Sequence, residues 1–140
     1  MELFGSWQYG ATADAQLSNG LIRSLSGVRS DAWTLGIARN DVVSSGDRLS
    51  LSLSQPLRVS AGQAEINAPT GRTDTGTVLR ESGSASLTPS GREIDVELAY
   101  RILLSEKEEL SAGALVQTSP GHVAGESAAF ATAVRYKRRF

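Results

Sequence analysis

The sequence has no cysteine and a single histidine, and these absences restrict its chemistry. Without cysteine the chain forms no disulfides, no thiolate metal sites and no cysteine nucleophile. His122 is therefore the only candidate imidazole base, and it lies in a loop directly after Pro120-Gly121. A serine hydrolase would need that imidazole between a serine and an oriented carboxylate, and no Gly-x-Ser-x-Gly string accompanies it. We expect no catalytic, metal or cofactor site.

Long apolar runs and a dominant charge sign are also missing. The 140 residues carry a net charge of -1, so we expect no nucleic-acid partner. No stretch approaches the ~20 apolar residues of a spanning helix, and the first residues lack the basic and apolar regions of a signal peptide. We expect one domain, residues 1–140, that either works in the cytosol or is the tail of a longer protein.

What the sequence does have is alternation of apolar and polar residues with period two, the pattern of β-strands. The clearest stripe runs from Ile94 to Leu104, and the segment from Ala128 to Phe140 alternates without a break. Similar patterns lie at Trp7–Ala13, Trp33–Ala38, Arg48–Ala61 and Leu110–Val116. They predict an all-β antiparallel meander of seven or eight strands.

Turn-forming residues separate these stripes. They lie at Asn19-Gly20, Ser44–Asp47, Pro69–Gly71, Pro89–Gly91 and Ser119–Gly121. The stretch from Gln63 to Leu87 allows two interpretations. Either Ala61-Gly62 is a tight turn, or Leu49–Ile66 is one strand bent at Pro56 and Gly62.

The last hairpin allows a register to be predicted. A loop centred on Val123 pairs residues whose numbers sum to about 246. This register places apolar pairs on one face and an opposite-charge pair on the other. The predicted pairs are Leu110 with Tyr136, Val116 with Phe130, and Glu109 with Lys137.

Alternation fits both a soluble β-sandwich and a membrane barrel. Three observations favour the barrel. Several strands reach the ~9–11 residues of a tilted membrane strand. The few aromatic residues lie near the expected strand ends, as in interfacial girdles. The polar face mixes charges of both signs with many serines and glycines, as a wet lumen does.

Five strings carry a family resemblance. They are Gly46–Val59, Pro69–Gly71, Pro89–Tyr100, Pro120–Gly125 and Val134–Phe140. Together they resemble the C-terminal end of subtilisin-like (S8 family) serine proteases that carry an autotransporter-type outer-membrane barrel. The resemblance covers most of the chain from about Asp31. It implies no protease activity for this chain, because the sequence around a subtilisin-type Asp, His or Ser is absent.

The chain is shorter than the full barrel of that family, so the resemblance implies the last half of an outer-membrane β-barrel of a Gram-negative bacterium, or a truncated gene product. Its partners would be outer-membrane lipid, the outer-membrane assembly machinery and an upstream passenger domain. The expected lumen-facing residues are Asp95, Glu97, Arg101, Arg135 and Lys137. The expected lipid-facing residues are Ile94, Val96, Leu98, Tyr100, Ile102 and Val134. The assembly signal would be Tyr136 and Phe140, with Phe140 ending the closing strand.

Two alternatives stay open, a soluble β-sandwich used for binding or adhesion and the remnant of a hydrolase.

The basic run Arg135–Arg139 suggests a nucleic-acid patch, but alternation puts three of its cations on the polar face. Glu106–Glu109 suggests a cation site, but mixed charges between two strands are typical of a solvated turn. The glycines between Gly71 and Gly91 are too scattered for a phosphate loop.

Overall fold

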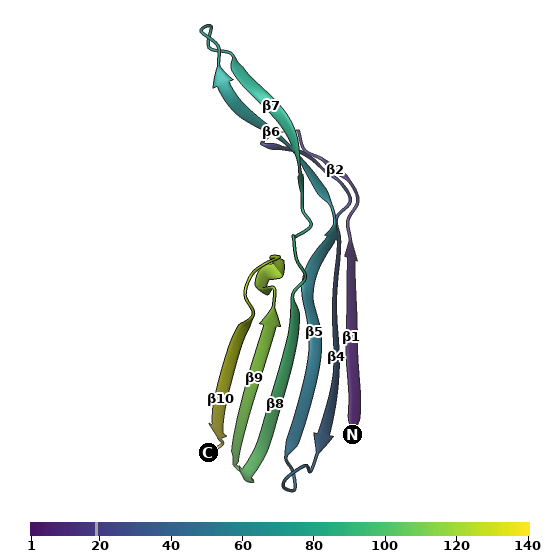
Figure 1. Cartoon of the computed structure of the whole chain (residues 1–140), viewed down its shortest axis with the longest axis vertical. Coiled ribbons are helices and arrows are strands. Elements are labelled where there is room, and N and C mark those ends of the chain that lie inside the picture. The colour runs from purple at the N-terminus through teal and green to yellow at the C-terminus, as the bar shows by residue number, and fades with distance from the viewer. Residues whose placement is uncertain (19) are drawn as a thin grey trace. The chain divides into compact units, whose positions relative to one another are not determined.

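The protein is all-β, with antiparallel pairing, in a computed structural model that describes residues 1–18 and 20–140. Among the described residues, ten strand segments lie in two sheets, with strand order β1-β4-β5-β8-β9-β10 in one and β2-β3-β6-β7 in the other (Figure 1). The segments are β1 (Glu2–Ala11), β2 (Ala15–Gln16), β3 (Ile22–Leu25), β4 (Arg29–Asn40), β5 (Arg48–Ala61), β6 (Gln63–Arg72), β7 (Val78–Ser86), β8 (Ile94–Ser105), β9 (Glu108–Thr118) and β10 (Ala129–Arg138). The prediction of an antiparallel β-meander is confirmed.

The residues group into two compact units where the sequence predicted one domain. Unit 1 comprises residues 1–8, 32–57 and 90–140, and unit 2 comprises residues 9–31 and 58–89. The three strands β1, β4 and β5 each contribute residues to both units. Within the described residues the six-stranded sheet is open, because its order begins at β1 and ends at β10.

The predicted register of the last hairpin is confirmed. Strand β10 pairs with β9 so that Tyr136 lies opposite Leu110, Phe130 opposite Val116, and Lys137 opposite Glu109. All ten pairs of this hairpin follow the same register without a bulge. The alternation was enough to predict the register, because a slip of one residue would move the whole apolar face of a strand to the other side of the sheet.

The sequence allowed either a tight turn at Ala61-Gly62 or one long bent strand. The structure has no hairpin at Ala61-Gly62. Strand β6 pairs with β3 and β7, not with β5, so the chain passes from one sheet into the other at Gly62. Gly62 has φ +150, a backbone conformation that side chains with a Cβ rarely adopt. The strand count of seven or eight was too low, because the described chain also contains two short segments, β2 and β3, for which no alternating stripe was predicted.

One predicted turn is wrong. Pro69–Gly71 lies inside β6, where the pairing with β7 shifts register, and the chain reverses later, at Thr73–Thr77. A proline is tolerated at a bulge as well as in a turn, so the sequence signal was ambiguous. Predicted turns at Ser44–Asp47, Pro89–Gly91 and Ser119–Gly121 do fall between strands. Asn19 of the Asn19-Gly20 signal lies outside the described residues.

The only helical segment in the described chain is the short 3-10 turn Pro120–His122, between β9 and β10. No helix among the described residues is long and apolar enough to cross a membrane.

Candidate functional site

The six-stranded sheet has two chemically different faces, and the registers of its strand pairs assign residues to each. In an antiparallel pair, directly opposed residues project to the same face. Asp95 lies opposite Ser54 and Gln117, Glu97 opposite Ser52, and Arg101 opposite Arg48 and Ser111. Arg135 also lies opposite Ser111, and Lys137 lies opposite Glu109. All five residues expected to face a lumen therefore share one face, called the polar face below.

The opposite face is called the apolar face. Leu98 lies between Leu51 and Ala114, and Val96 lies between Leu53 and Val116. The row continues into β10, where Val134 lies opposite Ala112. The six residues expected to face lipid (Ile94, Val96, Leu98, Tyr100, Ile102 and Val134) therefore lie on this one face.

Strand β1 extends both faces. Glu2 forms an ion pair of 2.7 Å with Arg48, whose register places it on the polar face. Leu3, next to Glu2 in an extended strand, therefore projects to the apolar face. There it helps line an apolar groove together with Leu35 of β4 and Val96 of β8.

Burial in this structure is reversed relative to an ordinary globular domain. The buried hydrophobic residues among those described are Ala38 and Ala64, whereas the buried polar residues are Asp47, Gln55, Glu93 and His122. Large apolar side chains of the apolar face are exposed, with Val134 at 75% and Leu98 at 47%. An exposed apolar surface of this kind marks contact with a membrane or another protein.

Aromatic residues of the apolar face lie toward both ends of β10, whereas Tyr100 lies in the middle of β8. Phe130 lies near the start of β10 and Tyr136 near its end, six residues later, which is about 20 Å along a strand. The sequence predicted Trp7 and Trp33 near strand ends, but both lie within strands, β1 and β4. Each lies within one residue of the end of a segment that belongs to unit 1.

The position predicted for Phe140 needs correction. Strand β10 ends at Arg138, and the last backbone hydrogen bond of this hairpin joins the Arg139 amide to the Lys107 carbonyl at 2.9 Å. Phe140 follows that bond and is fully exposed, so it does not end the strand. Tyr136 does lie within the strand, where its hydroxyl donates to Oε1 of Glu108 at 2.7 Å.

His122, set aside by the sequence as a turn residue, forms a buried polar contact at one end of unit 1. Its Nδ1 accepts a hydrogen bond from the Glu93 amide at 2.9 Å. Its Nε2 therefore carries the proton and donates to the Leu57 carbonyl, 3.1 Å away. Both ring nitrogens thus contact main-chain groups, which is a structural role in holding the loop to the sheet.

The carboxylate of Glu93 completes this contact. Its Oε2 accepts from the Gly121 amide at 2.6 Å, and its Oε1 accepts from the Gln117 side chain at 2.8 Å. Gly91 lies so close to the loop that a Cβ at its position would be 2.6 Å from the Ala124 amide nitrogen. Sequence spacing gave no signal of this cluster, because Glu93 and His122 are 29 residues apart.

A second buried polar group, Asp47, ends the loop between β4 and β5. Its carboxylate accepts three backbone N–H bonds, from Val42, Val43 and Ser44, and one from the Tyr100 hydroxyl. Burial raises the pKa of Asp47, but the hydrogen bonds from Tyr100, Val42, Ser44 and Val43 outweigh it and hold that pKa well below its usual range. Tyr100 thus lies on the apolar face and also fixes this loop.

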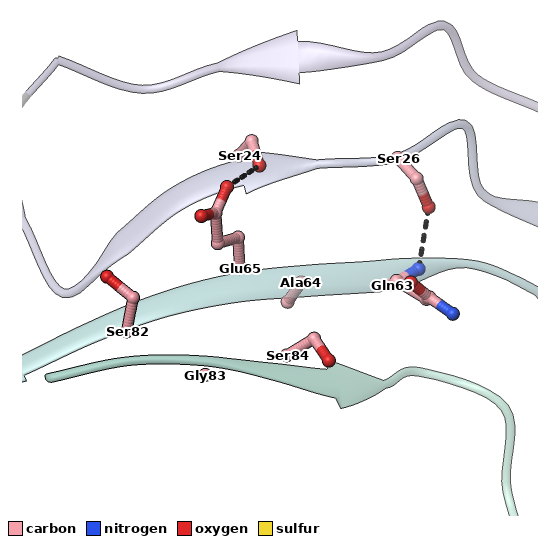
Figure 2. A pocket seen from close by; sticks show the side chains of 8 residues that line it. All are labelled: Ser24, Ser26, Gln63, Ala64, Glu65, Ser82, Gly83 and Ser84. Carbon is pink, nitrogen blue, oxygen red and sulfur yellow. Dashed lines mark hydrogen bonds between the residues drawn. The ribbon is translucent and has the colours of Figure 1, made fainter.

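Unit 2 has a shallow polar depression of about 430 Å³ on its sheet (Figure 2). Ser24 donates to Oε2 of Glu65 at 3.0 Å, and Ser26 accepts from the Gln63 amide at 2.7 Å. With one carboxylate and several hydroxyls, this depression lacks the paired carboxylates of an acid–base site. Among the described residues, no group of three or more His, Cys, Asp or Glu is arranged to hold a metal ion.

Comparison with protein-family models, with curated proteins and with solved structures finds no match to this chain.

Proposed function

We propose that this chain is an outer-membrane anchor and translocator segment of the autotransporter type. Its six-stranded sheet forms part of a barrel wall, with the apolar face against lipid and the polar face toward a wet lumen. The upstream passenger would be a subtilisin-like serine protease, as the sequence resemblance implies, and this chain itself performs no catalysis. Outer-membrane lipid and the outer-membrane assembly machinery are its partners.

One observation carries the proposal, the exposure of large apolar side chains along one face of the six-stranded sheet. In water this face would cost roughly 25 cal/mol for each Å² of apolar surface left uncovered. In a bilayer it needs no protein cover, because lipid tails replace the missing core. A water-filled lumen also needs a polar wall, and the serines, carboxylates and cations of the polar face provide one.

Two further features agree with this assignment. Aromatic side chains occur at both ends of the apolar band, as at membrane interfaces. The strands β4, β5, β8, β9 and β10 have 12, 14, 12, 11 and 10 residues, so each reaches the ~9–11 residues needed to cross a bilayer at a tilt.

The soluble β-sandwich is the competing function. A sandwich buries the apolar face of each sheet against the other, whereas here Val134 and Leu98 are exposed. Folding the chain with and without phosphatidylcholine vesicles separates the two. We expect aggregation in plain buffer, and cooperative folding with protease-protected strands in vesicles. A monodisperse, cooperatively folded monomer in plain buffer would contradict the membrane assignment and support the sandwich.

A further inference from the structure

The ring of His122 joins two strands that its own loop does not connect. The loop from Ser119 to Ala128 runs from β9 to β10. The ring nevertheless contacts the Leu57 carbonyl of β5 and the Glu93 amide, which directly precedes β8. The pairing of β5 with β8 extends to Ser54 opposite Asp95. Just beyond that pair, the buried imidazole bridges the two strands where the backbone ladder has ended.

This bridge is possible for only one form of the imidazole. Nδ1 accepts a hydrogen bond from the Glu93 amide, so it must carry no proton, and Nε2 donates to the Leu57 carbonyl. A protonated ring has an N–H group at both nitrogens. Its Nδ1–H would then face the Glu93 N–H, donor against donor. Because imidazole is the side chain that changes charge between about pH 5 and pH 8, mild acid should break the bridge on the Glu93 side.

The protonated ring has other partners close by. The carboxylate of Asp95 interacts electrostatically with His122, and the Glu93 carboxylate accepts from the amide of Gly121, the residue before His122. The neutral side chain of Gln117 on β9 donates to both carboxylates, at 2.8 Å to Glu93 and 3.3 Å to Asp95. The remaining charged residues of the segments around the ring are Arg58, Arg92 and Glu126. Arg58 donates to the Pro89 carbonyl at 3.4 Å.

The closed loop also opposes the conformational preference of its own backbone. Ser119 has φ +48 and His122 has φ +59, the left-handed region that residues other than glycine rarely adopt. Such residues keep this conformation only where surrounding contacts hold them in it. Loss of the bond at Nδ1 therefore allows the loop to relax away from the sheet.

We propose that His122 is a pH-sensitive switch, in which the neutral ring closes the loop between β9 and β10 onto β5 and β8, and the protonated ring releases it. The inference does not rest on the membrane function, because the contacts of His122 lie within unit 1 and are the same in a barrel wall and in a soluble sheet. In the proposed barrel wall, the loop lies at the end of the polar face that carries Asp95 and Gln117, so its release would change access to the lumen.

Amide hydrogen exchange of the whole chain tests the switch by NMR, in vesicles or in plain buffer, whichever supports cooperative folding. Exchange rates at each pH are converted to protection factors, which removes the intrinsic effect of pH on exchange. We expect protection of the Glu93 amide to fall about tenfold or more from pH 8 to pH 5, the size of effect that loss of a buried hydrogen bond gives. The Gly91 amide, which donates to the His122 carbonyl, should lose protection with it, whereas the Leu98 amide in the middle of β8 should not.

His122→Asn is the matched variant. Asparagine offers a non-titrating acceptor near the position of Nδ1 and is among the residues best tolerated at positive φ. Protection of the Glu93 amide in this variant should be the same at both pH values. A wild-type chain whose protection does not change with pH would overturn the proposal, as would a His122→Asn variant that still loses protection in acid.

The wild-type ring provides a second measurement if His122→Asn leaves the loop open at both pH values. His122 is the only histidine, so its Hε1 resonance reports its protonation without ambiguity. The midpoint of the loss of Glu93 protection should coincide with the midpoint of that titration. Midpoints that differ would assign the loss to another group and contradict the switch.

Discussion

The hydroxyl of Tyr100 donates a 2.7 Å hydrogen bond to Oδ2 of Asp47, joining β8 to the loop between β4 and β5 across 53 residues of sequence. The same carboxylate holds three backbone amides of that loop. The buried Asp47 carboxylate thus holds the loop and connects it to β8, which is separated from β4 by β5 in the sheet. The free energy of unfolding should therefore depend on the ionisation of Asp47.

Acid should destabilise the fold through Asp47. Because its folded-state pKa lies below the unfolded value near 3.8, its contribution is fully present above that pH and is lost as pH falls through the folded pKa. Tyr100→Phe removes one of the bonds that lower this pKa, so acid unfolding in detergent micelles should move to higher pH. Circular dichroism against pH measures the midpoint. Tyr136→Phe, which removes a hydroxyl bonded to Glu108, should leave the midpoint nearer to wild type.

Charges should be tolerated differently on adjacent residues of β8. Val96→Arg places a cation on the apolar face and should cost about 2–4 kcal/mol of unfolding free energy in vesicles if the site lies near the bilayer midplane. Glu97→Arg places it on the polar face, opposite Ser52, and should cost much less. Urea titration in vesicles compares the two variants. Equal losses at both positions would show that the lipid and lumen faces are misassigned.

Gly36 should resist enlargement because of Phe4. A Cβ at Gly36 would overlap Cζ of the Phe4 ring, so Gly36→Ala should destabilise by about 1–3 kcal/mol, as overpacking does. Gly83→Ala is the matched control, since nothing lies within 4 Å of its Cβ position. Adding Phe4→Ala should restore part of the loss. A double-mutant cycle of unfolding free energies measures this coupling, and simple additivity would contradict the contact.

His122 should hold the loop between β9 and β10. His122→Ala leaves the Glu93 amide and the Leu57 carbonyl without their partner, at about 1–3 kcal/mol for each buried group. Faster hydrogen exchange of the Glu93 amide and faster proteolysis between Ser119 and Gly125 are the expected signs. Val123→Ala, at an exposed position of the same loop, is the control. Unchanged exchange at Glu93 in His122→Ala would contradict this role.

Gly91 should be the least tolerant glycine near that loop. A Cβ there would lie 2.6 Å from the Ala124 amide nitrogen and 2.8 Å from the Val123 carbonyl carbon. These are backbone atoms, which cannot move away by a change of side-chain rotamer. Gly91→Ala should therefore displace the loop and break the hydrogen bond from the Gly91 amide to the His122 carbonyl. A lower melting temperature than that of Gly83→Ala is expected. Equal melting temperatures would show that the loop shifts without cost.

Three features could be predicted from the sequence alone: the fold class, the two faces of the late strands and the register of the last hairpin. These features follow from alternation, which is local and changes face with every residue. Tertiary structure alone decided that the chain changes sheets at Gly62, that Pro69–Gly71 bends a strand where a turn was expected, and that Glu93 and Asp47 are held by distant partners. Glycine and proline permit a bulge as readily as a turn, and hydrogen bonds spanning 29 to 65 residues leave no periodic trace in the sequence.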